Sequence, residues 1–93
     1  MILKCKIVDF FETSIEDIYF IEFSDLEYVP NFNLRFKYLN NIFKITSLSV
    51  GNHEYYNSLG KLYKNKVWSC GLRIMGESQN IHIPIGTEVD VLE

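Results

Sequence analysis

The sequence predicts an all-β protein, a small antiparallel β-barrel of six or seven strands. The 93 residues include 7 Phe and 6 Tyr but no Ala. Aromatic side chains suit pleated strands, whereas Ala is the best helix former. Short segments of alternating apolar and polar residues recur between turn signals along the chain. The length fits one domain with one modest core, so we expect residues 1–93 to form a single barrel.

The N-terminal third of the chain predicts two strands. The first is expected over residues 3–10, where loose alternation changes to an apolar run. The polar residues 11–16 favour a turn. Residues 17–23 are predicted to form the second strand, with Ile18, Phe20 and Glu22 on one face and Tyr19, Ile21 and Phe23 on the other. The Val29-Pro30-Asn31 sequence indicates another turn, because Pro fixes φ and has no N–H to donate to a neighbouring strand.

The central part of the chain predicts a β-hairpin. Apolar residues alternate with basic residues over residues 33–38, and the alternation continues over residues 42–50. The Asn40-Asn41 pair lies between them and favours a tight turn, because Asn tolerates positive φ.

The remaining segments complete the predicted barrel. Residues 51–66 show no clean period, which indicates a long loop with a short helical turn or a flexible hairpin, and long loops often carry function. Strand character returns over residues 67–76, and residues 81–85 and 87–92 are expected to be the closing strands.

Charged residues are distributed unevenly, although the net charge is only −3. Residues 1–30 carry a net charge of −5, residues 31–73 carry +6, and residues 74–93 carry −4. Because a barrel interleaves distant parts of the sequence, these blocks do not by themselves define surface patches, and solvated outer faces are the simplest interpretation.

The closing segment carries a recognisable pattern. Residues 70–76 read Cys-Gly-Leu-Arg-Ile-Met-Gly, and after a short polar stretch residues 83–89 read Ile-Pro-Ile-Gly-Thr-Glu-Val. This pattern resembles the second, β-barrel domain of the elongation factor Tu-type translation GTPases, in which a G-L-x-L-x-G strand precedes I-x-x-G-D. Residues 7–11 and 43–48 are similar to two further strands of that domain. The matching positions are Gly71, Leu72, Ile74, Gly76, Ile83 and Gly86.

The chain also departs from that family. Thr87 stands where the family has an acidic residue, and the opening turn, FETSIED, has no Gly. The resemblance implies a barrel whose glycines allow strands to turn corners. It does not imply GTPase activity, because the chain has no G-x-x-x-x-G-K-[ST] phosphate-binding loop.

We predict no catalytic, cofactor-binding or metal-binding site, and therefore no enzyme. His53 and His82 lack the spacing of metal ligands. Cys70 and His82 would form a dyad only if the thiol were activated, and Cys70 lies in an apolar strand. Two buried cysteines suit a reducing cytoplasm, and no signal peptide or membrane span is predicted.

The favoured function is a non-catalytic module that binds another protein, as an inhibitor or immunity-type protein covers a site on a basic toxin or nuclease. Tyr and Trp dominate protein interfaces, and acidic segments near both ends would speed encounter with a basic partner. The predicted partner-binding residues are Tyr55, Tyr56, Lys61, Tyr63, Lys64 and Trp68, together with Asp25 and Glu27.

The alternative is an RNA- or ribosome-associated barrel. Basic residues between Arg35 and Arg73 are interleaved with aromatic residues, and this combination contacts phosphates and stacks on bases. Small barrels bind RNA in this way. The acidic total argues against a dedicated nucleic-acid binder.

Overall fold

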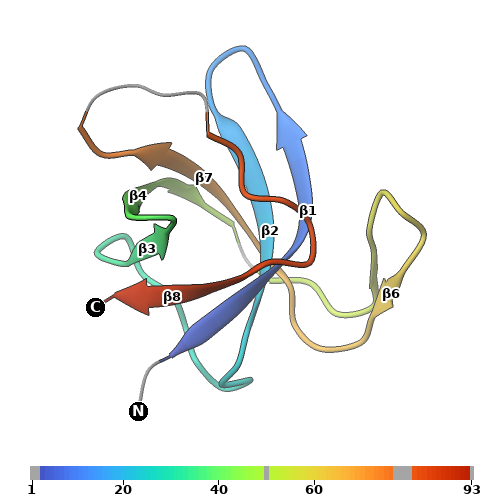
Figure 1. The fold of residues 1–93 in the computed structure, drawn as a ribbon. Helices are drawn as coiled ribbons and strands as arrows, with labels where there is room; N and C mark the ends of the chain where they lie inside the picture. The colour runs from blue at the N-terminus through green and yellow to red at the C-terminus, as the bar shows by residue number, and fades with distance from the viewer. Residues whose placement is uncertain (1–2, 50, 77–80, 93) are drawn as a thin grey trace.

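Six antiparallel strands form a closed barrel, as predicted (Figure 1). The computed structural model describes residues 3–49, 51–76 and 81–92. Around the barrel the strands follow the order β1, β2, β7, β4, β3, β8, and β8 pairs with β1 to close it. A two-stranded sheet of β5 and β6 lies outside the barrel. The bounds are β1 Lys4–Glu12, β2 Asp17–Phe23, β3 Arg35–Tyr38, β4 Asn41–Leu48, β5 Tyr55–Tyr56, β6 Leu62–Tyr63, β7 Trp68–Ile74 and β8 Glu88–Leu92.

The core consists of the inward side chains of the barrel strands. Successive side chains of a strand point to opposite faces, so a strand on a barrel wall buries every second residue. Tyr19, Ile21 and Phe23 of β2 are all buried, which confirms the alternation expected over residues 17–23. Phe36 of β3 faces Phe43 of β4 across the hairpin, and both rings are buried in the same core.

The turn of the β3–β4 hairpin lies one residue earlier than the predicted Asn40-Asn41 pair. Tyr38 pairs with Asn41, so the two turn residues are Leu39 and Asn40, with φ of 48° and 65°. Positive φ at both positions is typical of the I′ turn, whose twist matches that of the flanking strands. Asn41 begins β4, and its side-chain amide donates a hydrogen bond to the Leu39 carbonyl (3.1 Å).

The prediction of a strand over residues 81–85 is wrong. Pro84 has no N–H, and the Ile83 N–H donates to the Tyr19 hydroxyl (3.1 Å) instead of to a neighbouring strand. A turn follows, in which the Thr87 N–H donates to the Pro84 carbonyl (3.2 Å) and Gly86 has a φ of 93°. Ile83 is only 1% exposed, so this segment contributes to the core without being a strand.

Residues 51–66 form a short β-hairpin, one of the two predicted alternatives. Asn52 and Val67 exchange backbone hydrogen bonds of 2.8 Å, which close the base of this segment. Beyond this base, β5 pairs antiparallel with β6. Figure 1 shows the hairpin projecting from one side of the barrel.

Candidate protein-docking site

A β-bulge in β1 determines where the hairpin attaches to the barrel. The register between β1 and β2 shifts between Ile7 and Asp9, so Val8 is the extra residue. Ile7 and Phe10 pack on the barrel core, whereas Val8 and Asp9 both contact residues of the hairpin. The bulge therefore turns two consecutive side chains towards the hairpin, which regular alternation would not allow.

Asp9 is the central polar contact between barrel and hairpin. Its carboxylate is completely buried and accepts hydrogen bonds from the Tyr55 hydroxyl (2.5 Å), the Ser58 hydroxyl (2.7 Å), and the backbone N–H groups of Ser58 and Phe10 (both 3.0 Å). Burial acts to raise the pKa of Asp9, but the hydrogen bonds from Tyr55, Ser58 and Phe10 outweigh it and lower the pKa. Asp9 is therefore ionised at neutral pH, and its hydrogen bonds are charge-assisted.

Asn57 organises the tip of the hairpin. Its side-chain oxygen accepts hydrogen bonds from the backbone N–H groups of Leu59 (3.0 Å) and Lys61 (2.9 Å). Its side-chain amide donates to the Val8 carbonyl at the bulge (2.8 Å). One buried side chain thus shapes the turn over residues 57–60 and ties it to β1.

Two of the aromatic residues that were predicted to bind a partner pack against other parts of the protein instead. Tyr63 is 8% exposed and packs with Val8 and Val67 in a small apolar cluster outside the barrel. Tyr55 stacks on Phe20, with ring centroids 4.9 Å apart and an angle of 14° between the rings. Burial and the adjacent carboxylate of Asp9 raise the pKa of Tyr55, so its hydroxyl remains a donor.

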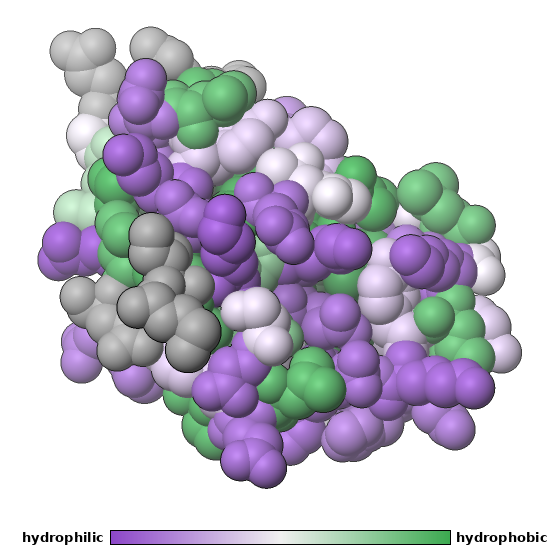
Figure 2. Space-filling model, turned by 60° about the horizontal axis from the view of Figure 1, so that its bottom comes forward, coloured by the Kyte–Doolittle hydropathy of each residue, from purple (hydrophilic) through white to green (hydrophobic). Residues whose placement is uncertain are grey.

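The tip of the hairpin exposes the remaining large side chains. Tyr56 is 66% exposed and Leu59 is 74% exposed, although the backbone around them is held by Asp9 and Asn57. On the face shown in Figure 2, apolar residues form separate spots among hydrophilic ones and not one continuous patch. Tyr56 and Leu59 are therefore exposed side chains on a hairpin whose backbone is held in place.

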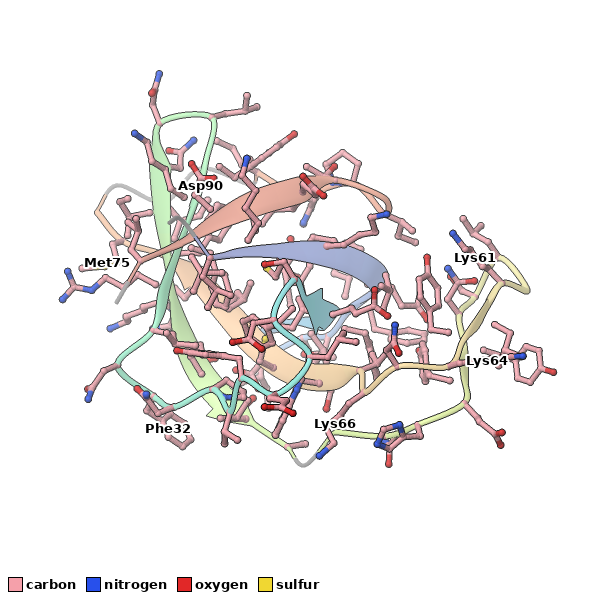
Figure 3. All side chains as sticks on the ribbon, turned by 90° about the horizontal axis from the view of Figure 1, so that it is seen from below. Phe32, Lys61, Lys64, Lys66, Met75 and Asp90 are labelled. Carbon is pink, nitrogen blue, oxygen red and sulfur yellow. The ribbon has the colours of Figure 1, made fainter. Side chains whose placement is uncertain are left out.

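Two of the three hairpin lysines lie against aromatic rings. The Lys61 Nζ lies 5.0 Å from the centre of the Tyr63 ring, and the Lys66 Nζ lies 5.3 Å from the Trp68 ring. Figure 3 shows Lys61 and Lys64 on the hairpin and Lys66 where the chain returns to the barrel. Trp68 begins β7 and is half-buried against the core, so it belongs to the barrel wall.

The predicted acidic residues lie elsewhere. Asp25 and Glu27 are exposed in the β2–β3 loop, where the Asp25 carboxylate accepts a hydrogen bond from the Glu27 N–H (3.0 Å). Figures 1 and 3 place this loop at one end of the barrel, whereas the hairpin projects from its side. The predicted partner-binding residues therefore divide between two separate places.

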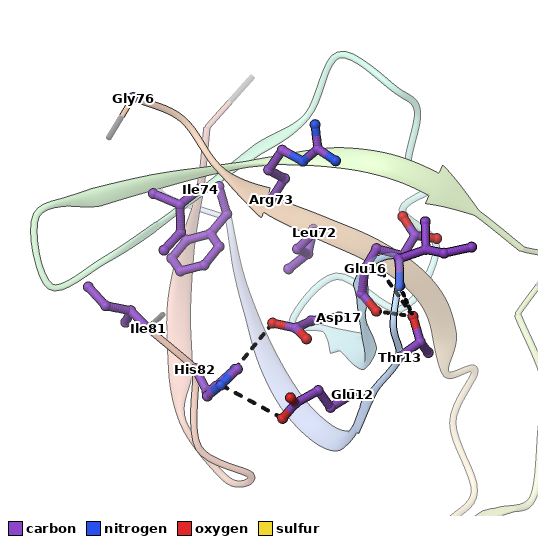
Figure 4. A pocket seen from close by; sticks show the side chains of 12 residues that line it. Glu12, Thr13, Glu16, Asp17, Leu72, Arg73, Ile74, Gly76, Ile81 and His82 are labelled. Atoms are coloured by element: carbon purple, nitrogen blue, oxygen red, sulfur yellow. Dashed lines mark hydrogen bonds and ion pairs between the residues drawn. The ribbon is translucent and has the colours of Figure 1, made fainter. Parts of the chain in front are cut away.

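A cavity of about 510 Å³ opens at the barrel end near the β1–β2 turn (Figure 4). His82 lies between two acidic side chains, with its Nδ1 3.2 Å from the Asp17 carboxylate and its Nε2 4.0 Å from that of Glu12. Phe43 and Leu72 contribute to the apolar part of the lining. Among the described residues, the lining contains the hydroxyl of Thr13 and the carboxylates of Glu12, Glu16 and Asp17, but no Ser, Cys or Lys.

The contacts of Cys70 are those of a core residue. Burial, followed by the charge of Glu16, raises the pKa of Cys70 to about 12, so its thiol is protonated at neutral pH. The contacts of His82 with described residues are those with Glu12, Asp17 and Phe10, and do not include Cys70. Within residues 3–49, 51–76 and 81–92, no group of three or more His, Cys, Asp or Glu side chains is placed to hold a metal ion.

Comparison with known proteins gives no match: no family model, no curated protein and no solved structure is similar to this chain. In the part of the chain that the structure describes, no helix has the length and apolar character needed to cross a membrane.

The sequence reasoning missed the three polar residues that hold the hairpin: Asp9, Asn57 and Ser58. A signal for the first was present, because an Asp within the apolar run Ile7–Phe11 requires a buried polar partner. Nothing in the sequence indicated that this partner comes from a segment 46 to 49 residues away.

Proposed function

We propose that the chain is a non-catalytic protein-binding module that docks on a partner through the β5–β6 hairpin. The supporting observation is a hairpin held by the Asp9 network that exposes Tyr56 and Leu59 at its tip. A segment held before binding loses less conformational entropy when it docks. Tyr is enriched among the residues that contribute most to interface energies.

The docking mechanism is occlusion of a site on the partner. Tyr56 and Leu59 would enter a depression on the partner's surface, and Lys64 would lie at the rim in contact with water. An inhibitor or immunity-type protein that covers a toxin or nuclease is one form of this function. The partner would meet the hairpin and not the acidic β2–β3 loop, because that loop lies at the end of the barrel and the hairpin projects from its side.

A photocrosslinking experiment tests this proposal. Tyr56 and Phe32 make a matched pair, because both are aromatic and similarly exposed, at 66% and 61%, on different segments. A photoreactive phenylalanine analogue at either position would be irradiated in native lysate, once with and once without nuclease treatment. We expect a discrete protein adduct from position 56 only, and its loss in Leu59→Ser.

Two outcomes would contradict hairpin docking. Equal adducts from positions 56 and 32 would show that the hairpin has no special role. Disappearance of the adduct after nuclease treatment would favour the second candidate, an RNA- or ribosome-associated barrel. That candidate is supported by Arg35, Lys44 and Arg73, which lie opposite one another on β3, β4 and β7. It is also supported by the motif likeness to translation-factor barrels, of which the structure shares the closed barrel form.

A further inference from the structure

The strand registers place three cations side by side on the outer face of β3, β4 and β7. Arg35 lies directly opposite Lys44, and Lys44 lies directly opposite Arg73. All three side chains are exposed. Because neighbouring strands are about 4.8 Å apart, the three side chains leave the barrel within roughly 10 Å of one another.

The rest of the outer face pairs its charges differently. Lys6 lies between Glu22 and Glu88, and Lys4 lies opposite Asp90 at a distance of 3.6 Å. In these cross-strand pairs the two residues have opposite charges, and such pairs stabilise the contact between neighbouring strands.

The acidic pair at the cavity has a polar neighbour. Glu12 faces Asp17 across β1 and β2, and His82 contacts both carboxylates. By contrast, Arg35, Lys44 and Arg73 make no ion pair with any residue that the structure describes. The cationic row therefore carries a repulsive cost that no ion pair among the described residues offsets, although Arg73 also lines the cavity that contains Glu12, Glu16 and Asp17.

We propose that this row is a docking surface for an acidic segment of a partner protein, separate from the hairpin. Charge complementarity requires the docking segment to be negatively charged, because its carboxylates would offset the repulsion among Arg35, Lys44 and Arg73. The surface is independent of the proposed hairpin function, because Figure 3 shows Met75, close to the row, on the side of the barrel away from Lys61 and Lys64.

The neighbouring side chains favour a protein over a nucleic acid. The adjacent outward row contains Asp90, which is paired with Lys4, followed by Lys37 and Ile42. The Met75 N–H donates to the Ile42 carbonyl (2.8 Å). Met75 is 42% exposed. Single-stranded nucleic acids need aromatic faces on which bases stack, and neither row offers one. Ile42 and Met75 would instead contact apolar side chains between the carboxylates of a peptide.

Fluorescence anisotropy at about 0.15 M salt, where charges more than about 8 Å apart are largely screened, tests this proposal with two probes of equal charge, a Glu-rich peptide that contains Leu residues and an oligouridylate. We expect the peptide to bind more tightly, and Lys44→Glu to weaken its binding about tenfold. Lys64→Glu is the matched control, because it makes the same charge change on the hairpin and should leave the affinity within about twofold.

Thermal unfolding of the same variants separates binding from structure. Lys44→Glu replaces two like-charged pairs with two opposite-charged pairs, so its melting temperature should rise while its affinity for the peptide falls. Equal affinity of Lys44→Glu and Lys64→Glu would overturn the proposal, as would failure of the wild-type protein to bind the peptide. Tighter binding of oligouridylate would reassign the row to a nucleic acid. The hairpin variants at positions 56 and 59 leave these outcomes unaffected.

Discussion

Replacement of Asp9 by Asn is the sharpest test of how the hairpin is held. The side chain keeps its shape but loses its charge and exchanges one acceptor oxygen for an amide donor. In the wild-type protein, one oxygen of the Asp9 carboxylate accepts hydrogen bonds from the Tyr55 hydroxyl and the Ser58 N–H. The other oxygen accepts from the Ser58 hydroxyl and the Phe10 N–H. In either orientation, the new amide therefore faces one backbone N–H, because only the hydroxyls can rotate to accept.

The magnitude follows from these contacts. A buried N–H left without an acceptor costs about 1–3 kcal/mol, and the remaining hydrogen bonds lose their charge assistance. We expect Asp9→Asn to lower the free energy of unfolding by about 3 kcal/mol. For a domain of this size, that corresponds to a decrease of roughly 15 °C in Tm.

Two measurements check this expectation. Urea denaturation followed by the fluorescence of Trp68, the single Trp of the chain, gives the free energy of unfolding. Amide exchange at Ser58 shows whether the hairpin detaches first. Glu22→Gln is the control, because its surface pairing with Lys6 should change stability by less than about 1 kcal/mol. A decrease below about 1 kcal/mol in Asp9→Asn, with unchanged Ser58 exchange, would refute the reasoning.

Three further predictions concern other contacts. Because the folded pKa of Asp9 is lowered, its stabilising contribution is complete above its unfolded pKa of about 3.9 and is lost as pH falls through the lower folded value. The Asp9 carboxyl carbon shift should therefore titrate below pH 3.9; titration above it would contradict this. Gly71→Ala should destabilise by about 1–3 kcal/mol, because a Cβ there would collide with the Glu16 carboxylate. Thermal unfolding should show partial rescue by Glu16→Ala, whereas strict additivity would count against the collision. Alkylation of Cys70 by iodoacetamide, followed by mass spectrometry, should require unfolding, because the thiol is buried and its pKa is raised to about 12. Rapid labelling of the native protein would disprove this.

The local pattern of the strands was predictable from particular residues. The pattern over residues 17–23 identified β2 with its correct bounds and divided its side chains between two faces, but it did not indicate which face is buried. The β3–β4 hairpin was predicted within two residues at each end, although its turn uses Leu39 and Asn40. The prediction failed at residues 81–85, where apolar alternation suggested a strand but Pro84 and the Tyr19 hydroxyl changed the backbone partners.

The candidate sites were less predictable, because exposure depends on what packs from elsewhere. Among the predicted aromatic residues, Tyr56 is exposed, Tyr55 and Tyr63 hold the hairpin, and Trp68 lies in the barrel wall. Composition alone does not separate an exposed Tyr from one that covers a neighbouring strand.

The sequence by itself determined the all-β class and the two faces of the strands β2, β3 and β4, because both follow from local composition and from the two-residue period of a strand. Only the tertiary structure decided which strands are neighbours. The bulge at Val8, the contact of Asp9 with a hairpin 46 to 49 residues away, and the row of Arg35, Lys44 and Arg73 all depend on register between distant segments. Register is decided by how the whole core closes, and a shift of one residue would move every side chain of a strand to the opposite face.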